Sequence, residues 1–290
     1  MKNRKLGVII ATMSGALYGL MPLLTKTVYA SGTNSLSVAF LRMCICTAAF
    51  LLLFMLTSKE TLRVTGKEFR ELLVCSSAFA FTPVLLYTSY NYLASGLATT
   101  LHFVYPVFVV IGSILFRIEK LTKKKVLCCA LCMAGIVSFY TPGGEISVKG
   151  ILIALSSGAV YAIYAVYLAA SDLLSMNPYK LSFWKHLIGL FIVGICAVCL
   201  RKIALPGTGT GWTFMLMLGL LTAAASLLYQ QATKLAGAQD TAMLSTFEPL
   251  TSVIVGYLVY SEELTVRSII GIVCILLSVI LLSTGGKKTE

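Results

Sequence analysis

The sequence predicts an all-α integral membrane protein with ten transmembrane helices, arranged as two five-helix repeats of opposite orientation. Of its 290 residues 58% are hydrophobic and only 12% are charged, whereas a soluble domain carries about a quarter charged residues. Apolar stretches long enough to cross a membrane follow one another along the chain with short polar gaps between them. The second half of the sequence also repeats the first. These three observations favour a chain surrounded by lipid.

A helix that crosses the hydrocarbon core of a bilayer needs about 20 mainly apolar residues. The first such stretch follows a basic start and has the look of a signal peptide, but its counterpart in the second half predicts a retained membrane helix. The stretches predict spans at roughly 6–28, 36–57, 69–91, 97–116, 124–141, 148–170, 179–200, 211–233, 240–260 and 265–284.

The basic residues predict how these spans are oriented. The net charge is +12, and Lys and Arg lie mainly in the short gaps between apolar stretches, which is typical of membrane proteins rather than of nucleic-acid-binding proteins. With the N-terminus inside, the outer segments hold few basic residues: Lys26, Lys149, Arg201, Lys202 and Arg267. We therefore expect a multi-pass protein of the cytoplasmic membrane with both termini cytoplasmic and no nucleic-acid partner.

The nine cysteines all lie inside apolar stretches. Two pairs, Cys129 with Cys132 and Cys196 with Cys199, are three residues apart, which places each pair on one helix face. Neither pair has a histidine or a second pair nearby, so the spacing favours packing between helices over metal or redox chemistry. We expect neither a metal site nor a cofactor.

Two stretches carry the internal repeat. GVIIATMSGALY (7–18) matches GILIALSSGAVY (150–161) at an offset of 143 residues, and the same offset aligns Pro106 with Pro249. LLYTSYNYLA (85–94) matches LLYQQATKLA (227–236) at an offset of 142. The halves are predicted at 1–143 and 144–290. Each holds five spans, an odd number, so the second half enters the membrane inverted, which is typical of many secondary transporters.

A proline, an apolar run and Glu-x-Leu-Thr occur together in both halves, as YPVFVVIGSILFRIEKLT and EPLTSVIVGYLVYSEELT. With the Phe-Leu-Arg of the second span and the five-plus-five layout, the sequence resembles the EamA family of the drug/metabolite transporter superfamily. The resemblance implies ten helices around a central cavity, alternating access, and transport of small polar or amphipathic metabolites, often outward. It does not specify the substrate.

Glu248 is the acidic residue that lies well inside a predicted span. A charged side chain at a helix centre costs about 2.5–3.5 kcal/mol on insertion scales, so it is expected to face a cavity or a partner. The carboxyl either binds a substrate ammonium group, carries a coupling proton, or is hydrogen-bonded to a neighbouring helix as a packing residue. The first half has Tyr105 at the equivalent place.

Pro106 and Pro249 are predicted to bend the fourth and ninth spans and to act as hinges. Each removes one backbone hydrogen bond, which leaves the carbonyls of His102 and Ser245 without a helical partner. Such groups must face protein or a wet cavity in lipid. The His102 side chain is either a packing residue or part of the site. His186, near the inner end of the seventh span, is predicted to be interfacial.

Two basic residues occupy mirrored positions in the second and seventh spans, Arg42 and Lys185. Their long side chains either reach the headgroups or form gates that close one side of the cavity. Aromatic and amide residues gather in the first, third, sixth and eighth spans. The cavity candidates among them are Tyr18, Tyr87, Tyr161, Tyr229 and Gln230.

The function predicted from these features is secondary active transport, with export of amino acids or similar small metabolites by rocking of the two halves. A drug- or sugar-type efflux transporter is the alternative of the same class, and a passive channel or sensor is the alternative of another class. An enzyme is not expected, because the sequence holds no clustered acid–base or nucleophile set. The expected partners are a small-molecule substrate and lipid, proton coupling is compatible with the sequence, and we expect a monomer.

Overall fold

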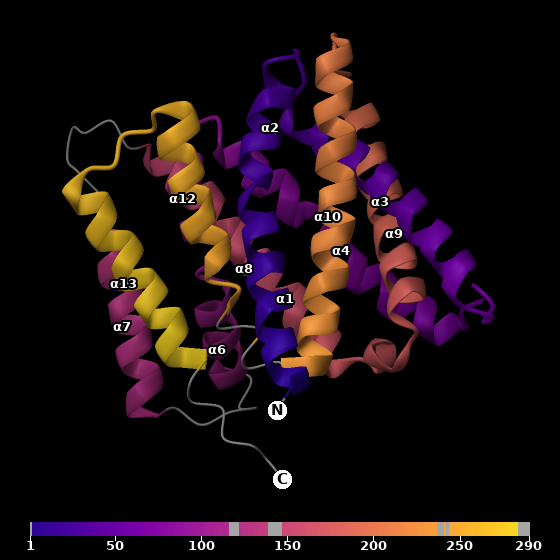
Figure 1. Ribbon diagram of the computed structural model, residues 1–290, viewed down its shortest axis with the longest axis horizontal. Coiled ribbons are helices and arrows are strands. Elements are labelled where there is room, and N and C mark those ends of the chain that lie inside the picture. The colour runs from indigo at the N-terminus through magenta and orange to yellow at the C-terminus, as the bar shows by residue number, and fades with distance from the viewer. Residues whose placement is uncertain (1, 116–121, 139–146, 237–240, 242–243, 284–290) are drawn as a thin grey trace.

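The computed structural model describes residues 2–115, 122–138, 147–236, 241 and 244–283, and these residues form a bundle of helices without strands (Figure 1). The helices of the first half are α1 (Lys2–Gly19), α2 (Met21–Tyr29), α3 (Ser35–Thr57), α4 (Gly66–Ser89), α5 (Ser95–His102), α6 (Tyr105–Leu115) and α7 (Lys123–Ser138). Those of the second half are α8 (Val148–Ala170), the short 3-10 helix η1 (Asp172–Ser175), α9 (Pro178–Cys199), α10 (Gly209–Ala236), α12 (Phe247–Tyr260) and α13 (Val266–Ser283).

Each of the ten predicted spans is occupied by helix. Within the described residues, six segments are long and apolar enough to cross a membrane, and four shorter apolar helices occupy the remaining predicted spans. The first span consists of α1 and α2, which are interrupted at Leu20, because Pro22 cannot donate a backbone hydrogen bond to the preceding turn. The equivalent position in α8 is Ala165, and α8 continues without a break.

The packing of the helices follows the inverted repeat. The pair α1–α10 has its repeat equivalent in α8–α4, and both pairs are in contact. The pairs α3–α9 and α7–α13 each join equivalent helices of the two halves. The first described residues and the end of α13 lie at the same end of the bundle, while the turns after α2 and α12 lie at the other end (Figure 1). The two halves therefore pack mainly against each other.

Small residues allow this close packing. A Cβ atom added at Gly158 would lie 2.7 Å from the His102 carbonyl oxygen, and one at the equivalent Gly15 would lie 3.1 Å from the Leu244 carbonyl oxygen. These two glycines occupy equivalent positions of the repeat. Without side chains at these positions, α8 approaches the end of α5 and α1 approaches the start of α12.

The outer surface of the bundle carries many exposed apolar side chains. They include Ile9, Met55, Leu152, Phe191, Ile195, Leu216 and Leu258. In water such a surface would be an aggregation site, whereas in a bilayer it faces hydrocarbon.

The prediction that His186 is interfacial is wrong, since only 1% of this residue is exposed. Its ring packs between Phe50 and Phe79, with centroids 5.2 and 5.1 Å away, and its Nδ1 lies 2.8 Å from the Ser182 carbonyl oxygen.

The close approach at Gly158 can be tested with a matched pair of variants. Gly158→Ala is expected to destabilise the fold by about 1–3 kcal/mol, because the added methyl group meets backbone that cannot move aside. Gly112→Ala is the control, since no described atom lies within 4 Å of its added Cβ, and helix propensity favours Ala there. Thermal unfolding in detergent measures both. Equal melting temperatures for the two variants would contradict the packing argument.

Candidate functional site

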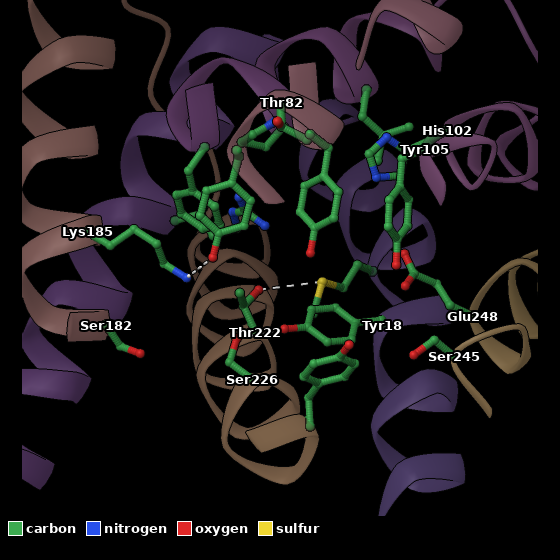
Figure 2. Close-up of a pocket in the computed structure, with 18 of the residues that line it drawn as sticks. Tyr18, Thr82, His102, Tyr105, Ser182, Lys185, Thr222, Ser226, Ser245 and Glu248 are labelled. Carbon is green, nitrogen blue, oxygen red and sulfur yellow. Dashed lines mark hydrogen bonds between the residues drawn. The ribbon is translucent and has the colours of Figure 1, made fainter. Parts of the chain in front are cut away.

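A cavity of about 520 Å³ lies inside the bundle. Helices of both halves line it: α1, α2, α3, α4, α5, α6, α8, α9, α10 and α12. The lining includes every side chain that the sequence singled out for the site or the gates: Tyr18, Arg42, Tyr87, His102, Tyr105, Tyr161, Lys185, Tyr229, Gln230, Ser245 and Glu248. Figure 2 shows Lys185 and Glu248 on opposite sides of this space. The structure brings these residues together, while their roles stay predictions.

Glu248 lies in the first turn of α12 and lines the cavity. Its carboxyl extends toward the Tyr105 side chain in Figure 2. Within the described part of the chain, no side chain lies within ion-pair distance of it and no hydrogen bond to its carboxyl oxygens is formed. A carboxyl inside a membrane-spanning bundle without a protein partner is costly. It is therefore available to a ligand or a proton.

Pro249 is placed so that it costs few hydrogen bonds. It is the third residue of α12, and the first N–H groups of a helix have no helical partner in any case. The expectation that the Ser245 carbonyl lacks a partner is wrong, because it accepts a hydrogen bond from the Glu248 N–H at 2.9 Å. This backbone hydrogen bond links residues three apart, as in a 3-10 turn. It joins the preceding turn to α12 and helps to fix the position of Glu248. Residues 240, 242 and 243 of the predicted ninth span lie outside the described residues.

Pro106 interrupts the fourth span. α5 ends at His102 and α6 begins at Tyr105, with the turn between them held by hydrogen bonds from Phe103 N–H to Thr99 O at 2.9 Å and from Val104 N–H to Leu101 O at 3.3 Å. The break turns the backbone of His102 toward Gly158 of α8. The bend predicted from Pro106 is thus a gap between two helices, and whether it moves stays a prediction.

His102 is held by a neighbouring helix. Its Nδ1 lies 2.9 Å from the hydroxyl oxygen of Ser157, which itself donates to the Ala154 carbonyl at 2.6 Å. The ring lies against Tyr105 and Tyr161, with centroid distances of 6.0 and 5.6 Å. These contacts fix His102 in the cavity wall and satisfy one of its two nitrogen atoms.

A series of aromatic rings covers the wall between His102 and Lys185. Tyr105 and Tyr161 meet edge to face with centroids 4.6 Å apart, and Tyr161 and Tyr164 follow at 5.3 Å. Tyr18 lies across the cavity, and its hydroxyl is 2.6 Å from the hydroxyl of Ser226. Gln230 donates to the Ser182 hydroxyl at 3.3 Å. The wall offers apolar ring faces together with a few hydroxyl and amide groups, which suits an amphipathic molecule.

Sequence reasoning missed several residues of this wall. Thr82, Thr222 and Ser226 also line the cavity, yet each is a small hydroxyl residue in an apolar helix. Such residues commonly bond to the carbonyl one turn earlier, as Thr82 does with Ala78 and Thr222 with Leu218. The sequence holds no signal that distinguishes them from packing residues.

Four residues at the end of the bundle where α2 and α12 finish contact one another and are called here the closure cluster: Lys26, Ser95, Tyr260 and Glu262. Glu262 follows α12 and forms an ion pair with Lys26 of α2. It also accepts hydrogen bonds from the N–H and the hydroxyl of Ser95, both at 2.8 Å, at the start of α5. The ring of Tyr260 lies under the Lys26 ammonium group at 5.0 Å, and its hydroxyl donates to the Leu23 carbonyl at 2.7 Å.

Glu262 is ionised at neutral pH. Burial raises the pKa of its carboxyl, but the hydrogen bonds from Lys26 and Ser95 together lower it more, so the pKa lies below the ordinary value. The carboxylate also lies at the N-terminus of α5, where a negative charge is favourable. The closure cluster therefore joins α2, α5 and α12 through charge-assisted hydrogen bonds. In the sequence, Glu262 stands out only as the first residue of the repeated Glu-x-Leu-Thr motif.

The cavity extends toward the opposite end of the bundle. There its lining includes Leu174 and Met176 from the segment between α8 and α9, Pro178 at the start of α9, and Thr233 near the end of α10. Leu174 is 62% exposed. This is the end at which the first described residues and the end of α13 lie (Figure 1). The described lining of the cavity thus reaches toward this end of the bundle, whereas no residue of the closure cluster belongs to it.

An inverted pair of helical repeats around a cavity lined by aromatic, polar and charged side chains is the architecture of many multi-pass membrane transporters. The sequence pattern of the EamA-like transporter family matches the chain twice, at residues 5–141 and 148–284. The chain belongs to the EamA-like transporter family.

Its relatives carry the same general description. An uncharacterized transporter of Archaeoglobus fulgidus is 27% identical over 277 residues, which cover 95% of each chain. An uncharacterized transporter of Synechocystis is 28% identical over 209 residues, covering 69% of this chain and 62% of the relative. One of Bacillus subtilis is 28% identical over 207 residues, with 69% and 67% covered. A solved crystal structure at 14% identity covers 96% of this chain and 98% of its own with a TM-score of 0.69, which supports the fold alone.

The closure cluster can be tested through access to the cavity. Glu262→Gln removes the ion pair with Lys26 and weakens the cap on α5, so the closed end is expected to open more often. A cysteine introduced at Thr99, which lines the cavity, is then expected to react faster with a membrane-impermeant maleimide added on that side. The control is Glu263→Gln, an exposed neighbour. Equal reaction rates in the two variants would show that Glu262 does not hold this end shut.

Proposed function

We propose that this protein is a secondary active transporter that exports amino acids or similar small metabolites across the cytoplasmic membrane by alternating access. The observation that carries the proposal is the cavity with Glu248 in its wall, whose lining reaches toward one end of the bundle while the closure cluster joins the helices at the other end. A transporter of this kind needs a binding site that is reached from one side at a time.

The distribution of basic residues supports loading from the cytoplasm. The end toward which the cavity extends carries Lys59, Arg63, Lys67 and Arg70 around the turn between α3 and α4. Basic residues gather on the cytoplasmic side of membrane proteins. With the chain in this orientation both termini are cytoplasmic, and the cavity in this conformation receives a substrate from inside the cell, as an exporter must.

The walls of the cavity support an amphipathic, amine-bearing substrate. The Glu248 carboxyl offers a partner for an ammonium group, and the rings of Tyr105 and Tyr161 offer apolar surface beside it. Aromatic faces also attract cations at about 0.5–2 kcal/mol. Among small metabolites, amino acids and related amines combine these features.

The inverted repeat supports a second conformation related to this one. α2, α5 and α12 close one end through the closure cluster. The two halves, residues 1–143 and 144–290, would each adopt the conformation that the other has here. The equivalent helices of the other repeat would then cover the opposite end of the bundle. Because Glu248 lies between the two ends, one carboxyl can meet a proton from one side and a substrate from the other.

The role of Glu248 is tested by transport in proteoliposomes. Glu248→Gln keeps the shape of the side chain and removes its charge, so uptake of amino acids such as L-leucine is expected to fall at least tenfold or to lose its dependence on a proton gradient. Glu248→Asp is expected to retain part of the activity. Melting temperature and gel-filtration profile report whether the variants remain folded. Full activity with an unchanged response to the gradient would make Glu248 a packing residue.

The proposed orientation is tested separately by labelling in intact cells. In a Cys199→Ser background, Lys202→Cys places a thiol in the exposed turn before α10, and Lys59→Cys places one in the exposed turn after α3. A membrane-impermeant maleimide is expected to label position 202 and to label position 59 only after the cells are opened. The reverse pattern would overturn the orientation.

A further inference from the structure

Two cations from equivalent positions of the repeat, the buried Arg42 and the half-buried Lys185, face the same cavity. Arg42 lies in α3 and Lys185 in α9, at the 143-residue offset that relates the two halves. α3 and α9 pack against each other, and both side chains line the cavity. The inverted repeat therefore brings one cation from each half to one region of the wall.

Arg42 is buried with its hydrogen-bonding capacity only partly used. Only 8% of the residue is exposed, and its guanidinium carbon lies 5.4 Å from the centre of the Tyr87 ring. Its Nε has no hydrogen-bond partner among the described residues, and neither has the nearby Tyr87 hydroxyl. The Thr25 hydroxyl also forms no hydrogen bond of ordinary geometry, although it lies, like the Arg42 guanidinium, close enough to the Tyr87 hydroxyl for a weak interaction. Buried polar atoms are rarely left in this state unless a bound group satisfies them.

Lys185 reaches into the cavity from the neighbouring helix. Its ammonium nitrogen lies 3.2 Å from the Tyr164 hydroxyl and 4.1 Å from the centre of the Phe79 ring. An ammonium group has three donor hydrogens, and Tyr164 accounts for one of them. Neither Lys185 nor Arg42 has a carboxylate within ion-pair distance in the part of the chain that the structure describes.

The surroundings disfavour the other roles that these two residues could have. A side chain that reaches toward lipid headgroups would lie on the outer surface, whereas both of these line the cavity. A gate would need a partner of opposite charge nearby. Glu248 is the acidic residue among the described residues of the lining, and it lies on the side opposite Lys185 (Figure 2). Two uncompensated cations in a confined, partly apolar space favour the binding of an anion.

We propose that Arg42 and Lys185 form an anion subsite that binds the carboxylate of a zwitterionic substrate, whose ammonium end then points toward Glu248. The guanidinium and ammonium groups supply the donors, and Tyr87 and Tyr164 hold them in place through ring and hydroxyl contacts. That the bound molecule is carried across the membrane rests on the proposed function, while the subsite itself does not.

Binding to the purified protein tests the subsite with probes that differ only in their charged ends. L-leucine carries both charges, L-leucinamide only the positive one and 4-methylpentanoate only the negative one. Leucine and 4-methylpentanoate are expected to raise the melting temperature of the wild-type protein, with leucinamide much weaker than leucine. Arg42→Gln and Lys185→Gln are each expected to weaken leucine binding at least about 30-fold, which is the scale for removing one partner of a buried charge pair.

Control variants separate charge from folding. Arg42→Lys and Lys185→Arg keep the positive charges and are expected to restore much of the leucine binding. Lys59→Gln removes one charge from an exposed turn and is expected to change nothing. Leucinamide binding is expected to be the same in the wild-type and the glutamine variants, which also shows that the cavity is intact.

Three results would overturn the subsite. The first is that no carboxylate probe stabilises the wild-type protein. The second is that the glutamine variants lose leucine binding and leucinamide binding equally. The third is that sodium chloride stabilises the protein as much as sodium 4-methylpentanoate does, which would indicate a site for any small anion. Flux separates this proposal from the proposed function. Charge-dependent binding without flux supports the subsite and contradicts the proposed export. Flux of leucinamide but not of leucine supports transport and contradicts the subsite.

Discussion

The structure depends on one constraint: the carboxyl group of Glu248, which has no partner among the described side chains, lies in the middle of a membrane-spanning bundle. Glu248 lies at the start of α12, where Pro249 removes no helical hydrogen bond and where Ser245 accepts from the Glu248 N–H. Gly15 and Gly19 of the first span let the backbone of this turn come close. The cost of the carboxyl is tolerable only because it faces a cavity.

The inverted repeat makes that cavity and also makes it unequal. Equivalent helices from the two halves surround the same space, yet the equivalent of Glu248 is Tyr105, and the equivalent of Arg42 is Lys185. Lys26 of the closure cluster has Ala169 as its counterpart. The duplicated scaffold provides two related ends. These differences between the halves give one wall a carboxyl group, another wall two basic groups, and one end an ion pair.

The ten spans, their boundaries to within a few residues and the repeat could be predicted from the sequence, because each rests on local hydropathy or on matching segments. The meeting of Tyr18, Tyr161 and Glu248 in one space could also be predicted, since equivalent residues of an inverted repeat converge near its axis. The rotation of a helix about its own axis is harder to predict from the sequence. For this reason the sequence places His186 at the membrane interface, although its side chain is buried between helices. The ion pair of Lys26 with Glu262 joins residues far apart in the chain, and no local pattern announces it.

Distances between spin labels at the two ends of the bundle test alternating access most directly. One pair, at Ala30 and Glu263, spans the end shut by the closure cluster, and the other, at Leu174 and Gln231, spans the more open end; all four residues are exposed. On adding leucine or changing the pH in lipid nanodiscs, one distance is expected to lengthen in the same population in which the other shortens. Two distances that stay fixed, or that lengthen together as in an opening channel, would contradict the account.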